Sequence, residues 1–168
     1  MLVLNKYLRE LGINEDTWPF NEIAENVKAF ENGEPYDGRY VEKAPLKDGT
    51  IDEGFINAET FNMDTTLAMI IYSYLCYFRD NCMDFGVPGY LTMKNGKDMG
   101  VEYGSRKWYE IVNAMITGFR MYIMLEEESP RVTDYKEYSE WKRATAQYTR
   151  KMNYGIRLFA KHFSSLNW

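Results

Sequence analysis

The sequence predicts a mainly α-helical fold: a single-domain helical bundle of about five helices with one or two small β-hairpin insertions. Two observations favour this fold. Apolar residues recur three and four positions apart through the second half of the chain, which is the spacing of a buried helix face. The 168 residues, 45% hydrophobic and 27% charged, also have the length and composition of one soluble domain. We therefore expect one domain, residues 1–168, with N-terminal helices and an acidic loop in residues 1–60 and a helical core in residues 61–168.

The N-terminal part of the chain predicts two helices. Residues 1–10 place leucines along a short helix, and Gly12 follows as a stop signal. A second helix should begin after a cap at Asp16 or Thr17, because short polar side chains accept hydrogen bonds from the first unpaired N–H groups of a helix. Its apolar residues keep helical spacing until about Gly33. Both helices are therefore expected to pack by one face.

The helical pattern breaks in residues 32–60. This segment holds four glycines, two prolines and seven acids, and Asp48-Gly49 is typical of a hairpin turn. We expect a small irregular hairpin here, since a structureless loop of this length is unusual in a compact domain. The central helix should follow from about Asn62 to Asp84, and its apolar residues lie nearly all round it, which predicts burial on most sides.

A second small hairpin is predicted in residues 86–104. The pair Asn95-Gly96 is a turn signal, because both residues tolerate the positive φ angles that tight hairpin turns require. Short segments with strand-forming residues lie on either side of it, Tyr90–Thr92 and Val101–Tyr103. These segments are therefore predicted to be the two strands.

Two long helices complete the predicted core. Ser105 is expected to cap the first of them, which keeps one apolar face as far as about Glu127. The second is the longest helix of the chain and should run from a cap at Thr133 or Asp134 to about Ser165. Together with the central helix, these two segments account for most of the apolar residues available to a core.

The last predicted helix carries an apolar stripe with alternating steps of three and four residues, which predicts its packing face. The stripe consists of Tyr138, Trp141, Thr145, Tyr148, Met152, Gly155, Phe159, His162 and Leu166, widened by Ile156 and Phe163. Gly155 costs about 1 kcal/mol of helix propensity relative to alanine. A glycine at this position therefore predicts that a neighbouring helix approaches closely.

A second stripe on the same helix is polar and basic. It consists of Lys136, Glu140, Arg143, Gln147, Arg150, Tyr154, Arg157 and Lys161. Residues 135–168 hold seven Lys/Arg against two acids, a net charge of +5, whereas the rest of the chain holds 13 against 23, a net charge of −10. Most such stripes are solvated helix faces. However, arginines at seven-residue intervals with a tyrosine between them suit phosphates, through forked hydrogen bonds, and a stacked base.

From this stripe we take Arg143, Arg150, Tyr154, Arg157 and Lys161 as the candidate ligand-binding residues. The expected ligand is an anionic small molecule or an acidic host protein. A third interpretation is a homo-oligomer in which the stripe contacts the acidic half of a second copy. The three interpretations share one requirement, since the five side chains must lie on one exposed face of a continuous helix.

Several function classes find no support in the sequence. The net charge of −5 and the pI of about 5.0 argue against general nucleic-acid binding. His162 is the only histidine, and no CxxC, HExxH or glycine-rich phosphate loop occurs, so we expect no metal and no cofactor. Cys76 and Cys82 lie on different sides of the central helix and are expected to remain reduced thiols in a cytosolic protein. The best apolar run, Leu67–Phe78, is too short to cross a membrane.

Other polar residues have simple structural interpretations. Asn62 or Asp64 is expected to cap the central helix, with a carboxylate ligand or general base as the alternative role of Asp64. Glu126–Glu128 is expected to be a solvated helix end, with a cation or basic-partner site as the alternative. His162 lies on the packing stripe and is expected to be a core histidine. No catalytic residue is assigned, because one histidine without a neighbouring nucleophile motif does not make a catalytic set. Three aromatic residues at helical spacing are expected in the core: Trp108, Trp141 and Tyr148.

Three segments also carry recurring motifs in a fixed order. Residues 61–71 resemble an aromatic-x-Leu-Asp-x-Thr-Ile-Ala helix start, residues 107–119 a Trp-x-x-Ile-Leu-x-x-Met-Ile-x-x-Phe helix, and residues 155–168 a closing Gly-Leu-x-Leu-Phe-x-x-Tyr-Phe-x-x-Leu-Trp. Together they resemble a family of small uncharacterised tailed-bacteriophage proteins. Phe61 and His162 stand where that family is expected to have Trp and Tyr, and each keeps a large ring at a packing position.

The resemblance implies a phage-encoded protein that acts in the host cytoplasm. Small phage accessory proteins commonly bind host components, including the nucleotide signals of host immunity. We therefore expect a non-enzymatic binding protein, either sequestering an anionic nucleotide-like signal in counter-defence or binding a host protein. Two alternatives remain: a small hydrolase or carboxylate-metal enzyme, and an oligomeric scaffold or virion accessory protein.

Overall fold

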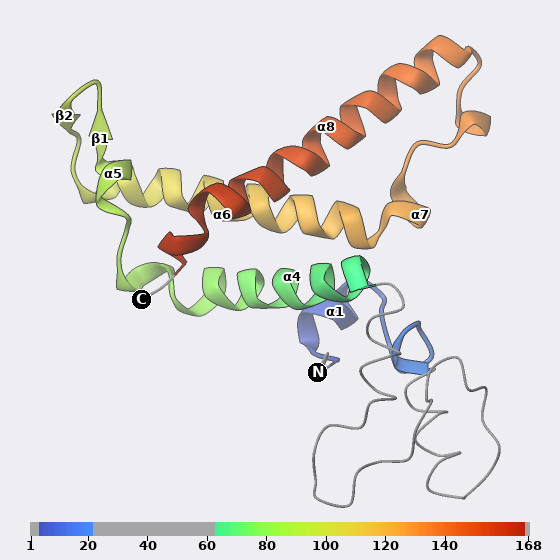
Figure 1. Ribbon diagram of the computed structural model, residues 1–168, viewed down its shortest axis with the longest axis horizontal. Helices are drawn as coiled ribbons and strands as arrows, with labels where there is room; N and C mark the ends of the chain where they lie inside the picture. Colours follow the sequence, from blue (N-terminus) through green and yellow to red (C-terminus); the bar gives the residue numbers. More distant parts are fainter. Residues whose placement is uncertain (1–3, 22–62, 167–168) are drawn as a thin grey trace, which may run out of the picture. The chain divides into compact units, whose positions relative to one another are not determined.

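The computed structural model describes residues 4–21 and 63–166 (Figure 1). Within these residues it contains six α-helices, three short 3₁₀ helices and one two-stranded antiparallel sheet. The predicted mainly α-helical fold with a small hairpin is therefore confirmed. The predicted hairpin at Asp48-Gly49 and the second predicted helix beyond Asn21 lie outside the described residues.

The chain divides into two compact units, residues 1–73 and residues 74–168. The boundary falls inside helix α4 (Met63–Asn81), so that this helix contributes residues to both units. Each unit is described by itself below. The single domain expected for residues 1–168 stays a prediction.

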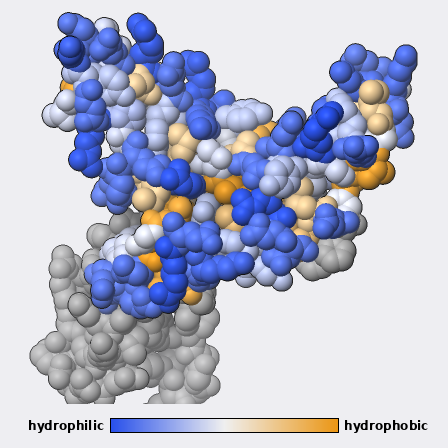
Figure 2. Space-filling view, turned by 180° about the vertical axis from the view of Figure 1, so that it is seen from behind, coloured by the Kyte–Doolittle hydropathy of each residue, from blue (hydrophilic) through white to orange (hydrophobic). Residues whose placement is uncertain are grey.

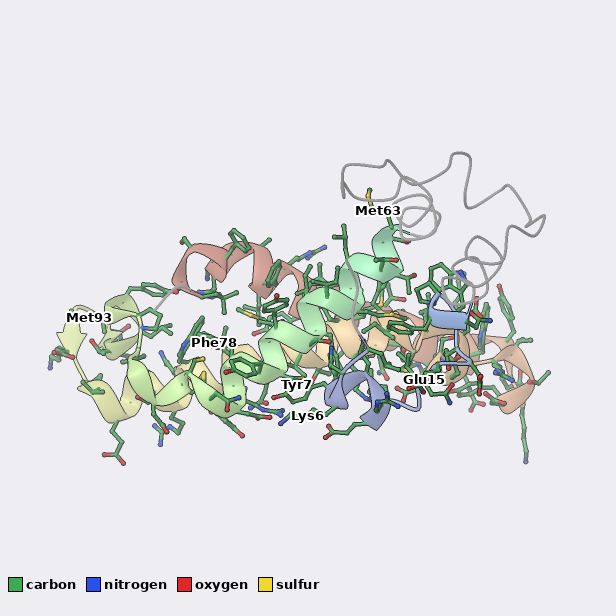
Figure 3. All side chains as sticks on the ribbon, turned by 90° about the horizontal axis from the view of Figure 1, so that it is seen from below. Lys6, Tyr7, Glu15, Met63, Phe78 and Met93 are labelled. Carbon is green, nitrogen blue, oxygen red and sulfur yellow. The ribbon has the colours of Figure 1, made fainter. Side chains whose placement is uncertain are left out.

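In the first unit, helix α1 (Lys6–Glu10) forms because Asn5 caps it. The side-chain oxygen of Asn5 accepts hydrogen bonds from the backbone N–H groups of Tyr7 (3.1 Å) and Leu8 (3.3 Å), which have no acceptor inside the helix. Tyr7 and Leu8 are the buried residues of this helix (Figure 3, where Tyr7 is labelled). Gly12 takes a left-handed conformation with a φ of +82°, and it ends this helix as predicted.

The start of the second predicted helix lies at the edge of the first described range. The backbone carbonyl of Thr17 accepts hydrogen bonds from the N–H groups of Phe20 (2.9 Å) and Asn21 (3.3 Å), the first helical residues. The Thr17 hydroxyl is engaged elsewhere, because it donates to Oδ1 of Asn14 at 3.2 Å and accepts the Asn14 N–H at 3.1 Å. Thr17 therefore marks the helix start, although its side chain does not cap the helix.

Ser73 connects α1 with α4 inside the first unit. Its hydroxyl accepts a hydrogen bond from the side-chain amide of Asn5 (3.0 Å) and donates one to the carbonyl of Met69 (2.8 Å). Helix α4 is described from Met63 onward, and Asp64 lies in the first turn of this range. Asn62, the other predicted cap, lies outside the described residues. A carboxylate in the first turn interacts favourably with the positive end of the helix dipole.

In the second unit, α4 is followed by the 3₁₀ helix η1 (Met83–Phe85) and then by a small hairpin. Its strands are β1 (Met93–Lys94) and β2 (Lys97–Asp98), which pair antiparallel. The two residues between them have positive φ angles, 51° at Asn95 and 77° at Gly96. This is the backbone conformation of the tight turns that match the twist of paired strands. The predicted hairpin turn is therefore confirmed.

The strands predicted beside this turn are wrong. Tyr90–Thr92 belongs to the short helix α5 (Gly89–Thr92), which begins after Pro88, and Val101–Tyr103 forms the first turn of α6 (Val101–Ile123). A run of three residues fits one turn of helix as well as a short strand, so the pattern of either segment does not decide between the two. The first turn of α6 also corrects a second expectation, since Ser105 lies within the helix and does not cap it.

Helix α6 is followed by the single turn α7 (Leu125–Glu128) and by the 3₁₀ helix η2 (Val132–Asp134). The last helix, α8, spans Tyr138–His162 and continues into η3 (Phe163–Ser165). The predicted start of this helix at Thr133 or Asp134 is therefore wrong. The carboxylate of Asp134 accepts the backbone N–H of Arg131 at 3.1 Å and so caps η2, and residues 135–137 separate η2 from the long helix.

Helices α6 and α8 cross and pack against each other (Figure 1), with two glycines at their closest approach. A Cβ atom built on Gly155 would lie 2.2 Å from the carbonyl oxygen of Ala114 and 2.8 Å from Cα of Gly118. A Cβ on Gly118 would lie 2.8 Å from the carbonyl oxygen of Met152. The predicted close approach at Gly155 is confirmed, because only glycine allows the two backbones to lie this near.

Aromatic residues of α8 extend this interface on both sides of the crossing. Phe159 makes an edge contact with Phe119 of α6, with ring centroids 5.2 Å apart. The Tyr148 hydroxyl donates to the carbonyl of Met121 (2.7 Å), and the Trp141 indole N–H donates to the carbonyl of Pro130 (3.0 Å). The expected packing role of Trp141 and Tyr148 is therefore supported by specific contacts.

The predicted apolar stripe is too long, because residues at both of its ends are exposed. Tyr138 at the start of α8 is 63% exposed, and Phe163 just beyond its end is 66% exposed. Between them, Gly155 and His162 are buried, and Trp108 of α6 is buried as predicted. The stripe therefore describes the C-terminal half of α8 correctly, where both buried residues lie.

Candidate functional site

The candidate ligand-binding residues lie on a single uninterrupted helix. All five belong to α8, which runs without a break from Tyr138 to His162. Each residue turns a helix by about 100°, so the five side chains fall within an arc of about 60°. The row extends about 27 Å along the axis at about 1.5 Å per residue. We call this row the basic face; it consists of Arg143, Arg150, Tyr154, Arg157 and Lys161.

Every residue of the basic face is exposed. Tyr154, the only ring among them, is 58% exposed. In Figure 2, hydrophilic residues cover most of the arm that the N-terminal half of α8 forms. Within residues 4–21 and 63–166, none of the four cations of the basic face forms an ion pair. The basic face therefore presents charged groups that the described part of the chain does not neutralise.

Each of the other five arginines of the described residues has an interaction partner, and three of them form ion pairs. Arg9 pairs with Glu15 at 2.5 Å, Arg79 with Asp80 at 2.7 Å, and Arg120 with both carboxylate oxygens of Glu128. The remaining two are held less tightly, Arg131 by the carbonyl of Glu126 (3.2 Å) and Arg106 by the ring of Tyr103 (5.8 Å to its centroid). Among the described arginines, those without a partner therefore cluster on one face of α8.

Two lysines on α8 offer a comparison with the basic face. Lys142 and Lys151 are also exposed, but they point about 80–100° away from the basic face on either side. Their charge equals that of two arginines of the basic face. A ligand that binds the basic face specifically should therefore depend on two of its arginines more than on Lys142 and Lys151. A ligand attracted only by the positive charge of α8 should depend on both pairs equally.

Chemically, the basic face suits anionic groups. A guanidinium donates two parallel hydrogen bonds to a carboxylate or a phosphate, and such forked pairs are stronger and more directional than a lysine contact. Tyr154 lies four residues after Arg150 and three before Arg157, so that its ring is next to both. It adds a stacking surface and a hydroxyl between the two forks.

His162 is a core histidine, as predicted, and it belongs to a polar group that the sequence did not indicate. It is 3% exposed, and its Nδ1 lies 2.6 Å from the Tyr90 hydroxyl, which is also 3.1 Å from the Ser165 hydroxyl. Burial lowers the pKa of His162 below its ordinary value, with a smaller effect from the nearby Lys161 cation. The imidazole is therefore neutral at pH 7.

The acidic run at the end of α6 is better ordered than expected. Glu126–Glu128 forms the turn α7, and Glu128 pairs with Arg120, although all three glutamates remain exposed to solvent. In the described residues, no group of three or more His, Cys, Asp or Glu side chains is arranged to hold a metal ion. No helix in this part of the chain combines the length and the apolar character that a membrane span requires.

No protein-family model, curated protein or solved structure matches this chain. The resemblance of residues 61–168 to tailed-bacteriophage proteins therefore stays a prediction. The function must be argued from the geometry and charge of the basic face.

Proposed function

We propose that this protein is a non-enzymatic binding protein whose basic face recognises an extended acidic surface of a partner protein. One observation carries the proposal. Arg143, Arg150 and Arg157 share an exposed face without ion-pair partners, whereas each of the other described arginines has a partner. Unpaired arginines at seven-residue intervals favour contacts with a ligand over a role in stability.

The length and shape of the basic face favour a protein partner. Small-molecule sites are concave and surround most of their ligand. The basic face instead follows the convex side of a helix for about 27 Å, the length of an acidic helix of about 18 residues. The phage resemblance supports a host protein as the partner and the host cytoplasm as the place of action.

A second candidate is a nucleotide-like signal, bound in counter-defence. Its support is the group of Arg150, Tyr154 and Arg157, which spans only about 10 Å along the helix. Two guanidinium groups on either side of an exposed ring suit a ligand with phosphates next to a base. Such a ligand would leave Arg143 and Lys161 unused, and for this reason it is the second candidate.

The experiment is a calorimetric titration with two kinds of anion: a poly-glutamate peptide of about 20 residues, long enough to span the basic face, and a panel of mono- and cyclic dinucleotides. The wild type is compared with R150A/R157A and with K142A/K151A, which removes the same charge beside the basic face. We expect the peptide to bind the wild type, and R150A/R157A to weaken it about tenfold, at about 0.7 kcal/mol for each exposed pair. K142A/K151A should change the affinity by less than about twofold.

The other outcomes separate the alternatives. Binding of a nucleotide but not of the peptide, weakened by R150A/R157A, would select the second candidate. Absence of binding to every anion would contradict both. Sedimentation of the same variants tests the scaffold interpretation, which requires the wild type to self-associate and R150A/R157A to dissociate it.

A further inference from the structure

A cavity of about 430 Å³, partly open to solvent, lies in the second unit, and none of its lining residues belongs to the basic face. It is bounded by the end of α4, the segment after η1, α5, α6 and η3; Figure 3 labels Phe78 on α4. Its volume falls in the range of about 300–1,000 Å³ typical of small-molecule sites. The lining residues are Phe78, Cys82, Gly86, Val87, Pro88, Gly89, Tyr90, Trp108, Ser164 and Ser165.

Aromatic rings form a continuous group beside this cavity. Phe78 meets Trp108 edge to face, with ring centroids 6.1 Å apart and planes at 81°. Trp108 in turn contacts His162 (5.9 Å), which lies nearly parallel to the ring of Tyr90 at 5.8 Å. Because the rings hold one another in place, the three that line the cavity have fixed positions: Tyr90 is half exposed, whereas Phe78 and Trp108 are buried and expose little surface.

The polar groups that line the cavity are neutral. None of the described lining residues carries a charge, and the side-chain donors are hydroxyls, one thiol and the indole N–H of Trp108. The Tyr90 hydroxyl is fixed by Nδ1 of His162 at 2.6 Å and by the Ser165 hydroxyl at 3.1 Å, so that its position is set before any ligand arrives. A charged ligand would lose its hydration here without gaining an opposite charge.

The backbone leaves additional room on one side. Gly86 and Gly89 both line the cavity, and a Cβ atom built on either would meet no atom within 4 Å. Peptide N–H and C=O groups of this Gly86–Gly89 segment are therefore not screened by side chains at those two positions. The carbonyls of Pro88 and Gly89 already accept hydrogen bonds from the Leu91 N–H (2.8 Å) and the Thr92 hydroxyl (2.9 Å). The other peptide groups of the segment are suited to hydrogen-bond the edge of a planar ligand.

We propose that this cavity is a binding site for a neutral, planar heteroaromatic molecule of nucleoside size. Its ring would pack against Tyr90, the exposed ring of the lining, and its polar edge would meet the backbone of Gly86–Gly89 and the hydroxyl of Ser165. This site is separate from the basic face and does not depend on the function proposed for it.

Cys82 makes the proposal testable without knowledge of the natural ligand. Cys76 and Cys82 are both buried and form no disulfide, as predicted, but of the two only Cys82 is among the residues lining the cavity. A small neutral thiol reagent that enters the cavity should therefore modify Cys82 faster than Cys76. Cys76 is the internal control, because its modification reports opening of the whole fold.

The experiment measures the modification rates of both cysteines by mass spectrometry with adenosine and indole as probes. Adenosine monophosphate and cyclohexanol serve as the charged and the non-aromatic comparison. An aromatic probe at about ten times its Kd should slow the modification of Cys82 about tenfold and leave Cys76 unchanged. Ser164→Phe, a larger side chain in the cavity lining, should remove this protection, whereas R150A/R157A should keep it.

A second measurement covers the case in which the reagent does not reach Cys82. In ¹⁵N-labelled protein, adenosine or indole should shift the amide signals of Gly86 and Gly89 in the wild type but not in Ser164→Phe. The proposal would be overturned if no aromatic probe protected Cys82 or shifted the glycine signals. It would also be overturned if cyclohexanol and adenosine monophosphate protected Cys82 as well as adenosine does.

Discussion

Gly155 sets the distance between the two longest helices of the second unit. A Cβ atom there would lie 2.2 Å from the carbonyl oxygen of Ala114 and 2.8 Å from Cα of Gly118. Both obstacles are backbone atoms of α6, which cannot rotate aside as the end of a side chain can. The contact therefore depends on the absence of a side chain at this one position.

We predict that Gly155→Ala lowers the free energy of unfolding by about 1–3 kcal/mol, because overpacking a closely packed contact costs that much. The change occurs although alanine gains about 1 kcal/mol of helix propensity. Urea denaturation followed by circular dichroism measures it. The control is Gly89→Ala in α5, where a Cβ meets no atom within 4 Å and the stability should hardly change. A Gly155→Ala variant as stable as the wild type would contradict the observed helix crossing.

His162 is the other residue whose chemistry depends on its surroundings. It is the only histidine of the chain, and burial lowers its pKa in the folded state below the ordinary value. The unfolded chain therefore binds the proton more readily than the folded one. Stability from the neutral imidazole is complete above the unfolded pKa of about 6.5 and is lost as the pH falls through the folded pKa.

We therefore predict that the free energy of unfolding decreases between about pH 7 and pH 5, and that His162→Phe flattens this part of the profile. Phenylalanine keeps the ring beside Trp108 and removes the titrating group. Denaturant titrations at a series of pH values measure the slope, and NMR of the single imidazole gives its pKa directly. A His162 pKa above about 6.5 would contradict a buried neutral histidine.

At the scale of elements, side chains of α8 complete the end of α6. The last carbonyl groups of a helix have no intrahelical donor. Tyr148 donates its hydroxyl to the carbonyl of Met121 (2.7 Å), within the last turn of α6. Trp141 donates to the carbonyl of Pro130 in the connection to α8 (3.0 Å). The interface between the two helices thus includes hydrogen bonds to backbone groups as well as apolar contacts.

Tyr148→Phe should consequently lower the free energy of unfolding by about 1 kcal/mol, the usual net contribution of one hydrogen bond. Tyr154→Phe removes the same hydroxyl from the same helix at an exposed position, and it should leave stability unchanged. Thermal unfolding of the two variants in parallel measures the difference. Equal stability of the two would show that the contact between Tyr148 and Met121 contributes nothing.

The elements also show where sequence patterns are sufficient. The turn at Asn95-Gly96 and the glycine contact at Gly155 were predictable, because positive φ angles and close backbones each require particular residues. The start of α8 was not, because the side chain of Asp134, expected as a cap, accepts the N–H of Arg131 in a separate turn. The same holds for Tyr90–Thr92, where three residues are too few to distinguish helix from strand.

Across the whole molecule, the candidate site was predictable only in part. Helical spacing was enough to place Arg143, Arg150 and Arg157 on one face, because the period of a helix determines the direction in which each side chain points. Their lack of partners was not predictable, since that depends on every acidic side chain nearby. The group of Tyr90 and His162 was also missed, because the two residues are 72 positions apart in the chain and only the fold brings them together.

Charge at this scale gives a further prediction. Residues 135–168 carry +5 and the rest of the chain −10, so anions should be attracted to α8 while the protein as a whole repels them. Affinity for the poly-glutamate peptide should therefore fall by more than about tenfold between about 0.05 M and about 0.5 M salt, as exposed charges become screened. Calorimetric titrations at the two salt concentrations measure this change. A salt-independent affinity would indicate an apolar contact instead.

The most direct test of the basic face compares two double variants of equal charge with one probe. In calorimetric titrations of poly-glutamate at low salt, R150A/R157A should bind about ten times more weakly than K142A/K151A. That result would mean that the direction of the arginines matters and not only the charge of α8. Equal affinities for the two variants, or no binding by the wild type, would contradict the account.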